Sequence, residues 1–413
     1  MGGVIRTPVR SHAESVAYPA VRGVPSVSMA VLLFLVSSWV GCGGRTTLPI
    51  HVAAARGDLE RVRAILMKRP NLANAPNDGG WTPLHFACRW GDSAVVACLL
   101  DHAADPNRRT DQGRETPLHL AATHSLPIAR LLLDHGARVE ARRRDGETPL
   151  GVAAQWNQRQ VVALLLSRGA QVNARSAQGF TPVILAAVGV GDLPPDSGVV
   201  SLLAAHGADV NARDVDGSSA LVFAALLGKV DVVEALLAAS ADVQADRASR
   251  IGPLRAAVMY RKSAIAETLL ARGADPRAAD RMGMTPLHWA ARNNDTVLVA
   301  ALIHAGAGLE AREKMGRTPL LMTLERPAPA AMQALLARGA DVDARDASGG
   351  TALHAAAARN DVEMVRMLLQ AHADANAKNQ DGDTPLMLIR PERENGAVSR
   401  LLRAFGARGR AGA

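Results

Sequence analysis

The sequence repeats one unit about every 33 residues. In full form it reads as a Gly-containing turn, Thr-Pro-Leu-His-x-Ala-Ala, a polar break, an apolar stretch ending in Leu-Leu, and Gly-Ala-Asp-Val-Asn-Ala. Successive units start 34, 34, 32, 33, 38, 33, 33, 33, 33 and 33 residues apart, counted at the proline slot. A unit this short cannot bury its apolar face alone, so a stack of mutually dependent units is expected. The slot holds Pro49, Pro83, Pro117, Pro149, Pro182, Ala220, Pro253, Pro286, Pro319, Ala352 and Pro385.

The chemistry of one unit predicts two helices. In the last unit Gly382 supplies a turn with positive φ, and Thr384 caps a helix whose first-turn Pro385 needs no N–H partner. In the preceding unit residues 361–371 place apolar side chains at helical spacing, which indicates a second helix with one buried face. The Gly-Ala that follows Leu-Leu in most units is typical of a left-handed helix end.

This pattern resembles the ankyrin repeat, from Leu48 onward. The resemblance implies an all-α solenoid of about eleven stacked helix-turn-helix units with β-turn fingers over residues 48–408, followed by a disordered tail at 409–413. It also implies a monomeric scaffold for protein–protein interaction that binds its partner on the concave face. The fifth unit carries five extra residues within Val188–Gly198, which predict a projecting loop, and Arg250 replaces the turn glycine of unit seven, which predicts a distorted finger.

The N-terminus has the pattern of a targeting segment. Arg6, Arg10 and Arg22 precede the apolar run 29–41, which ends at Gly41-Cys42. This resembles the signal of bacterial lipoproteins, although Trp39 stands where that family usually has leucine. We therefore expect residues 1–42 to be a signal or anchor segment, 43–47 a linker, Cys42 a lipidation site and the bacterial cell envelope the location. An uncleaved membrane anchor, secretion, and a cytoplasmic protein with a later start codon remain open alternatives.

No catalytic, metal or cofactor site is expected. Five of the 12 histidines occupy the Thr-Pro-Leu-His slot, where the ankyrin family uses the ring to hydrogen-bond neighbouring turn backbone. The spacing of the histidines is therefore set by the repeat and not by ligand geometry. Cys88 and Cys98 stand at positions of the repeat that usually hold core residues, so both thiols are expected to be buried. The chain is accordingly predicted not to be an enzyme.

The aromatic residues favour a particular binding surface. Trp81 and Phe180 fall on fingers just before Thr-Pro, and Trp90, Trp156 and Tyr260 follow the Ala-Ala of their units. These positions line the concave face in ankyrin proteins, and exposed aromatics are typical interface anchors. His124 is expected between Trp90 and Trp156, with the run Arg142, Arg143 and Arg144 as a charged rim. The alternative is that the rings only pack on adjacent helices.

Two other classes of function remain open. An immunity or neutralising partner of a toxin or enzyme would use the same scaffold, and so would a binder of a small molecule or polyanion. Nucleic acid is an unfavoured partner, because the formal charge of +8 comes from 47 basic and 39 acidic residues spread along the chain.

Overall fold

The computed structural model describes residues 47–90, 92–190, 196–244, 251–390 and 396–408. Within these ranges the chain is helical and contains no strand, apart from an isolated bridge between Arg213 and Ser219. The prediction of an all-α solenoid is therefore confirmed. The predicted segments 1–42 and 409–413, residues 191–195 of the Val188–Gly198 insertion and Arg250 lie outside the described residues.

Helices of the described chain alternate between a short first helix and a longer second one. The first helices, called inner helices below, are α2 (Pro49–Ala55), α4 (Pro83–Trp90), α6 (Pro117–Ala121), α8 (Pro149–Gln155), α10 (Pro182–Val188), α12 (Ala220–Leu227), α14 (Pro253–Met259), α16 (Pro286–Arg292), α18 (Pro319–Met322), α20 (Ala352–Arg359) and the 3-10 helix η3 (Pro385–Leu388). The second helices, called outer helices, are α3 (Leu59–Lys68), α5 (Ser93–Asp101), α7 (Leu126–Asp134), α9 (Arg159–Ser167), α11 (Ser197–Ala205), α13 (Val230–Ala238), α15 (Ser263–Ala271), α17 (Thr296–His304), α19 (Pro329–Leu336), α21 (Val362–Gln370) and α22 (Ala397–Ala404). One more 3-10 helix, η1 (Pro70–Asn74), follows α3.

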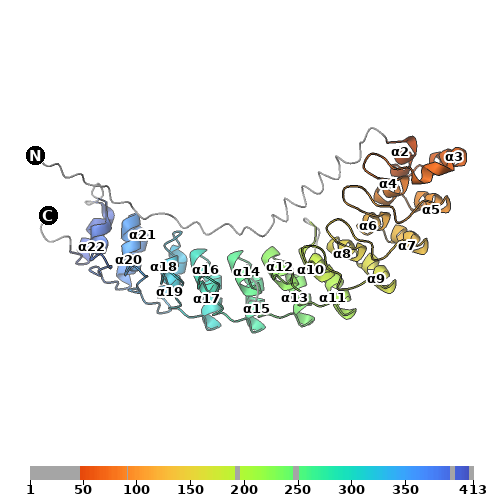
Figure 1. Ribbon diagram of the computed structural model, residues 1–413. Coiled ribbons are helices and arrows are strands. Elements are labelled where there is room, and N and C mark those ends of the chain that lie inside the picture. Colours follow the sequence, from red (N-terminus) through yellow and green to blue (C-terminus); the bar gives the residue numbers. More distant parts are fainter. Residues whose placement is uncertain (1–46, 91, 191–195, 245–250, 391–395, 409–413) are drawn as a thin grey trace, which may run out of the picture.

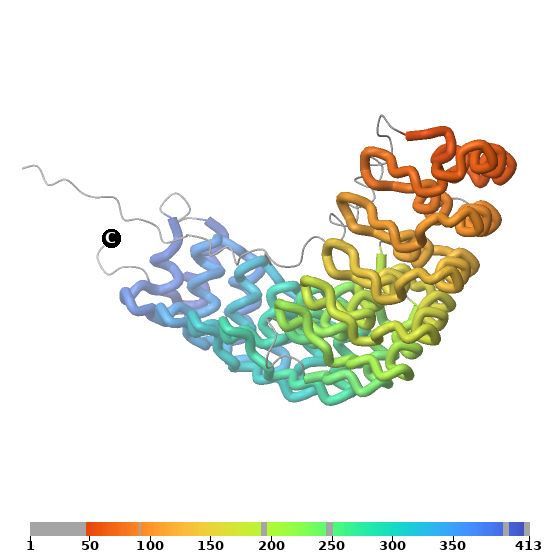
Figure 2. Tube along the Cα trace, turned by 45° about the vertical axis from the view of Figure 1, so that its right-hand side comes forward, coloured from red at the N-terminus to blue at the C-terminus, as the bar shows by residue number. Residues whose placement is uncertain are grey.

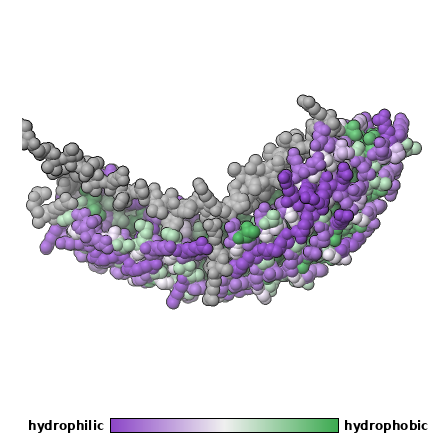
Figure 3. All heavy atoms as spheres, in the orientation of Figure 1, coloured by the Kyte–Doolittle hydropathy of each residue, from purple (hydrophilic) through white to green (hydrophobic). Residues whose placement is uncertain are grey.

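The pairs stack into a long arc. Figure 1 shows the inner helices on the inner side of this arc and the outer helices on its outer side. Figure 2 shows the same chain as one continuous curved stack from its N-terminal to its C-terminal unit. The face seen in Figure 3 is largely hydrophilic, with apolar residues scattered over it. The apolar residues gather instead between the units, in a core cluster that extends from Ile50 to Leu402.

Helix ends follow the chemistry predicted from the unit. Proline stands at the first position of most inner helices, for example Pro117 of α6 after the capping residue Thr116. Outer helices commonly end before a glycine with positive φ, as at Gly136 (φ 84°) and Gly339 (φ 83°). These residues reverse the chain toward the finger of the next unit.

A histidine ring joins each of five units to the next finger. In unit three the backbone N–H of Thr116 donates to His119 Nδ1 over 3.2 Å, so the ring hydrogen lies on Nε2 and donates to the Glu147 carbonyl over 3.3 Å. The same pair of bonds recurs at His51, His85, His288 and His354. The role that the family resemblance implied for these histidines is confirmed.

Adjacent fingers are also joined by single backbone hydrogen bonds. The N–H of Asp111 donates to Gly79 O over 3.0 Å, and that of Arg144 donates to Gly113 O over 2.8 Å. Equivalent bonds link later fingers, for example Ala347 N to Met315 O at 2.8 Å. Neighbouring units are therefore joined by core contacts, by hydrogen bonds between fingers and, in five units, by a histidine ring, as a one-dimensional array requires.

The buried histidines predict a loss of stability in mild acid. Burial lowers the pKa of His85 to about 4, and burial together with the Arg143 cation lowers the pKa of His119 to about 3. An unfolded histidine titrates near 6.5, so between about pH 6.5 and pH 4 the unfolded chain binds more protons than the folded one. The stability that the neutral rings contribute is complete above pH 6.5 and is lost as the pH falls.

Urea unfolding at pH 7 and pH 5 tests this prediction. The free energy of unfolding lost between the two values should be about 2 kcal/mol smaller in His119→Gln than in the unchanged protein. His304→Gln, which alters an exposed ring on α17, is the control. Burial raises the pKa of Glu147 to about 7, which gives the opposite pH dependence, but it does so in all three proteins. Equal losses of unfolding free energy in all three proteins would contradict the prediction that His119 stays neutral in the folded protein.

Candidate partner-binding surface

One set of residues follows the inner helices along the inner side of the arc. We call these residues, each seven positions after the first residue of its inner helix, the inner row. Because they end or follow the helices that line the inside of the arc (Figure 1), they are the residues best placed to meet a partner there. The inner row is Arg56, Trp90, His124, Trp156, Gly189, Leu227, Tyr260, Asn293, Arg326 and Arg359.

Trp81 is buried, and the expectation that it faces solvent from its finger is wrong. Its exposed fraction is 9%, and its ring packs against Phe86 with centroids 5.5 Å apart and against His85 at 5.8 Å. The ring therefore packs on residues of α4. Its role is structural.

Trp90 is the exposed end of the same cluster. Its ring stacks on Trp81 with centroids 6.1 Å apart and an interplanar angle of 24°, and 48% of the residue remains exposed. The Arg89 guanidinium lies 5.8 Å from the ring centroid. Because stacking on Trp81 already restrains the ring, Trp90 can contact a partner with little loss of side-chain entropy.

The other predicted contact residues do not form one patch. His124 is exposed in the unit after Trp90, and Trp156 is half-buried in the unit after that. Phe180 is also half-buried and packs edge-on against Phe223 at 5.8 Å, so it belongs partly to a neighbouring unit contact. Tyr260 is 40% exposed but lies in unit seven, three units beyond Trp156. Trp90, His124 and Trp156 thus lie in the consecutive units two, three and four, and Tyr260 lies three units further along.

The run of three arginines is partly engaged within the protein, and the predicted charged rim is wrong for Arg143. Its side chain is 9% exposed and pairs with Glu147 at 3.2 Å and Glu115 at 3.4 Å. Arg142 donates from Nη1 to the carbonyls of Gly146 (3.0 Å) and Arg175 (2.8 Å). Arg142 and Arg144 are both exposed, so they stay candidate surface charges.

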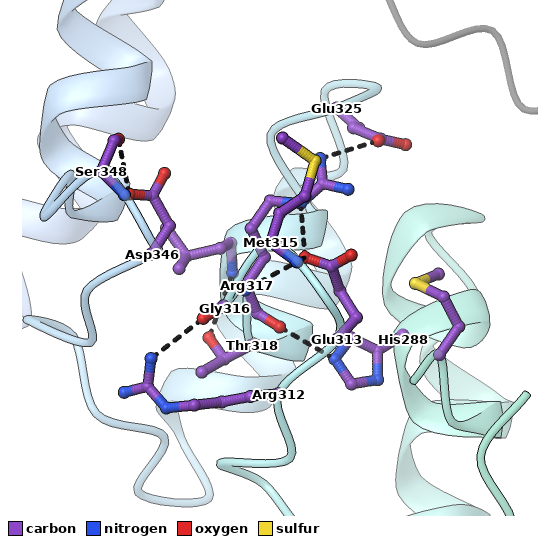
Figure 4. Close-up of polar contacts among 12 residues, drawn as sticks. His288, Arg312, Glu313, Met315, Gly316, Arg317, Thr318, Glu325, Asp346 and Ser348 are labelled. Carbon is purple, nitrogen blue, oxygen red and sulfur yellow. Dashed lines mark hydrogen bonds and ion pairs between the residues drawn. The ribbon is translucent and has the colours of Figure 1, made fainter. Parts of the chain in front are cut away.

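The arginine that follows Asn-Ala is a clamp between fingers. Arg312 Nη1 donates to Gly316 O at 2.9 Å within its own finger (Figure 4). It also donates to the carbonyl of Arg345 in the next finger. Arg345 repeats the arrangement with Gly349 at 3.1 Å and with Lys378. The basic slot of the repeat therefore satisfies backbone carbonyls, which explains its recurrence without a partner.

An ion-pair network in units eight and nine had no clear signal in the sequence. Glu325, in the turn after α18, pairs with Arg292 at 2.6 Å and with Arg317 at 2.9 Å. Arg317 also bonds Glu313 at 3.0 Å, and the Glu313 side chain is fully buried (Figure 4). Arg292 in turn lies over the Trp289 ring, 5.3 Å from its centroid. Such pairs across successive units depend on stacking, which spacing within one unit does not reveal.

The described residues offer no assembled chemistry for catalysis or metal binding. No group of three or more His, Cys, Asp or Glu side chains among them is arranged to hold a metal ion. Cys88 and Cys98 are both buried, and burial raises the pKa of each thiol, which disfavours the reactive thiolate. None of the helices in the described part of the chain is long and apolar enough to span a membrane.

Comparison with known proteins agrees with the repeat architecture. The sequence model of a family described as "Ankyrin repeats (3 copies)" matches residues 27–110, 105–176, 169–247, 254–346 and 323–407. The human DNA-binding protein RFXANK is 41% identical over 61 residues, which is 15% of this chain and 24% of that protein. Mouse 2-5A-dependent ribonuclease is 42% identical over 57 residues, 14% of this chain and 8% of the enzyme. Human ankyrin repeat and SAM domain-containing protein 3 is 33% identical over 78 residues, 17% and 12% of the two chains.

These relatives share short stretches of repeat only. The match spans about a quarter or less of the length of each of the three. Their names indicate DNA binding in one case and ribonuclease activity in another, and those properties describe the relatives. What the chain shares with all of them is the repeated unit.

The contrast between Trp81 and Trp90 gives a stability prediction. Trp81→Ala removes a buried ring and should lower the free energy of unfolding by about 3 kcal/mol. Trp90→Ala removes a ring that is half exposed and should lower it by about 1 kcal/mol or less. Chemical denaturation of both variants makes the comparison, and equal destabilisation would show that the two rings do not divide into a core and a surface residue.

Proposed function

The chain belongs to the ankyrin-repeat family, and on that premise we propose that it is a non-enzymatic scaffold that binds a protein partner on the inner side of its arc. The observation that carries the proposal is the exposed Trp90 ring, which is stacked on the buried Trp81. A large, rigid and half-exposed aromatic contributes less to the core than a buried one. Such residues often dominate the affinity of an interface.

The proposed contact surface covers units two to four of the inner row. Trp90 and Trp156 are its anchors, and His124 lies in the unit between them. Packed helices lie roughly 8–10 Å apart, so two anchors separated by two repeats are about 20 Å apart, which fits one side of a standard interface. Burial and the nearby Arg89 cation lower the pKa of His124, which favours a neutral ring at this position.

Binding to a partner captured from cells tests the surface. Trp90→Ala and Trp156→Ala should each weaken the complex by about 2 kcal/mol while the folded state is retained, because both rings are partly exposed. Met67→Ala is the control, since Met67 is 81% exposed on the outer helix α3. Affinity is measured by calorimetry and folding by thermal denaturation. Normal binding of both tryptophan variants would exclude this surface.

Identification of the partner as a toxin or enzyme that the chain inhibits would make the scaffold an immunity protein.

We further propose that the protein is attached to a bacterial envelope through Cys42. The proposal is supported by the basic residues Arg6, Arg10 and Arg22, the apolar run 29–41 and the small Gly41 before the cysteine. All of these residues lie outside the described part of the chain, so the argument is one of sequence alone.

Palmitate labelling tests the attachment. In a bacterial host the full chain should incorporate the label, and Cys42→Ala should abolish incorporation. The matched control is Cys98→Ala, because Cys98 is buried in the repeats. Labelling that persists in Cys42→Ala would contradict lipidation at this residue.

A further inference from the structure

The inner helices differ from the outer helices in charge. Among the described residues, none of the inner helices contains Asp or Glu, although Arg89, Arg255, Arg292 and Arg359 lie on them. Carboxylates do occur on outer helices, for example Glu60 on α3 and Glu267 on α15. The inner helices are therefore poorer in negative charge than the outer helices.

In units six and seven the residue that precedes the outer helix, at its N-cap position, is positively charged. Five outer helices are capped by an aspartate whose carboxylate accepts a backbone N–H of the first turn, namely Asp58, Asp92, Asp196, Asp295 and Asp361. The same position holds Lys229 before α13 and Lys262 before α15, and neither makes a capping bond with its side chain. Lysine is unfavourable there, because it accepts no hydrogen bond and its charge opposes the helix dipole.

Both lysines reach back over a glycine of the preceding unit. A Cβ on Gly189 would lie 2.6 Å from Lys229 Nζ, and one on Gly228 would lie 2.9 Å from Lys262 Cε. Lys229 Nζ donates to the Val188 carbonyl at 2.8 Å, and burial lowers the pKa of this amine. The absence of side chains on the two glycines leaves room for the lysine stems to lie against the inner surface.

Apolar and aromatic residues precede the two lysines by two or three positions. Leu227 and Met259 are half-buried, and Tyr260 is 40% exposed. The Arg261 side chain is 64% exposed, and its Nε lies 3.8 Å from the Asp295 carboxylate. We call Lys229, Tyr260, Arg261 and Lys262 the central cationic patch.

The spacing of the patch matches an extended chain. Equivalent residues of stacked units lie roughly 8–10 Å apart, and in an extended polyproline II chain every third side chain lies on the same face, about 9 Å further along. A peptide with a carboxylate at every third residue can therefore place successive charges opposite successive lysines. The apolar residues between the lysines would contact the intervening side chains.

We propose that the central cationic patch binds an extended acidic polypeptide segment, with carboxylates on Lys229, Lys262 and Arg261 and an apolar side chain against Tyr260. This inference rests on the proposed function, since it names the chemistry of the partner. A peptide is favoured over a nucleic acid, because nucleic-acid binding requires a continuous track of cations along closely spaced phosphates. Here the capping aspartates Asp196 and Asp295 flank the patch on both sides.

Fluorescence anisotropy with full-length protein tests the proposal. The probe is a labelled 15-residue peptide of five Glu-Val-Thr repeats, and the same peptide with Gln for Glu is the uncharged control. The variant Lys229→Asp with Lys262→Asp installs the cap found in the five other units. Its expected effect is binding at least about tenfold weaker, together with a melting temperature that changes little, because the two new caps offset the loss of the hydrogen bond from Lys229 to Val188. Loss of affinity without loss of stability separates a binding role from a structural one.

The matched control changes the same charges on the outer side. Lys68→Asp with Arg272→Asp alters two exposed residues at the ends of α3 and α15 and should leave affinity within about twofold. Equal binding of the Glu and Gln peptides, or unchanged affinity in the Lys229/Lys262 variant, would overturn the proposal. So would displacement of the peptide by a 15-residue oligothymidylate at a lower concentration than by unlabelled peptide, which would indicate a nucleic-acid surface.

A second measurement separates this inference from the proposed function. Lys262→Asp and Trp156→Ala are compared for binding to the partner captured from cells. If Trp156→Ala weakens that complex and Lys262→Asp does not, the acidic segment is wrong and the scaffold function stands. If neither substitution weakens it, the inner surface itself is excluded.

Discussion

The stack depends on a neutral histidine that bonds two units at once. His119 accepts a hydrogen bond from Thr116 at the start of its own helix and donates one to Glu147 in the next finger. A protonated ring carries hydrogen on both nitrogens and could no longer accept the Thr116 N–H. Burial holds the ring neutral, so this contact, which five of the units make, joins neighbouring units and makes the stack sensitive to acid.

The residues of the inner row take little part in the contacts that join one unit to the next. Inner helices are short and rich in alanine, and ring bonds, backbone bonds and arginine clamps join their fingers to the next unit. Because these contacts recur at fixed slots, residues such as Trp90 or Tyr260 can vary without disturbing the array. Variation at the inner row can then serve recognition.

Most of the fold could be predicted from the sequence, because at most positions of the repeat a local requirement of the backbone, such as a turn or a helix cap, determines the residue type. The turn glycines, capping threonines and slot histidines are examples, and their helices appear where the pattern places them. The site was less predictable, because exposure depends on the neighbouring units. Trp81 occupies a finger slot but is covered by the Trp90 and Phe86 rings, and Arg143 is enclosed by carboxylates from two fingers. Neither fact follows from position within one unit.

A residue that differs from the one usually found at its position in the repeat is more informative about function than a residue that fits the repeat. A threonine or aspartate in a capping slot is explained by the helix it caps, so it says nothing about a partner. Lys262 in the same slot adds positive charge at the start of α15 and makes no cap, so the fold gains nothing evident from it. Residues that break a local rule without a compensating structural contact are expected at functional positions. In an array whose units are otherwise interchangeable, such exceptions are where the specificity of this chain for its partner should lie.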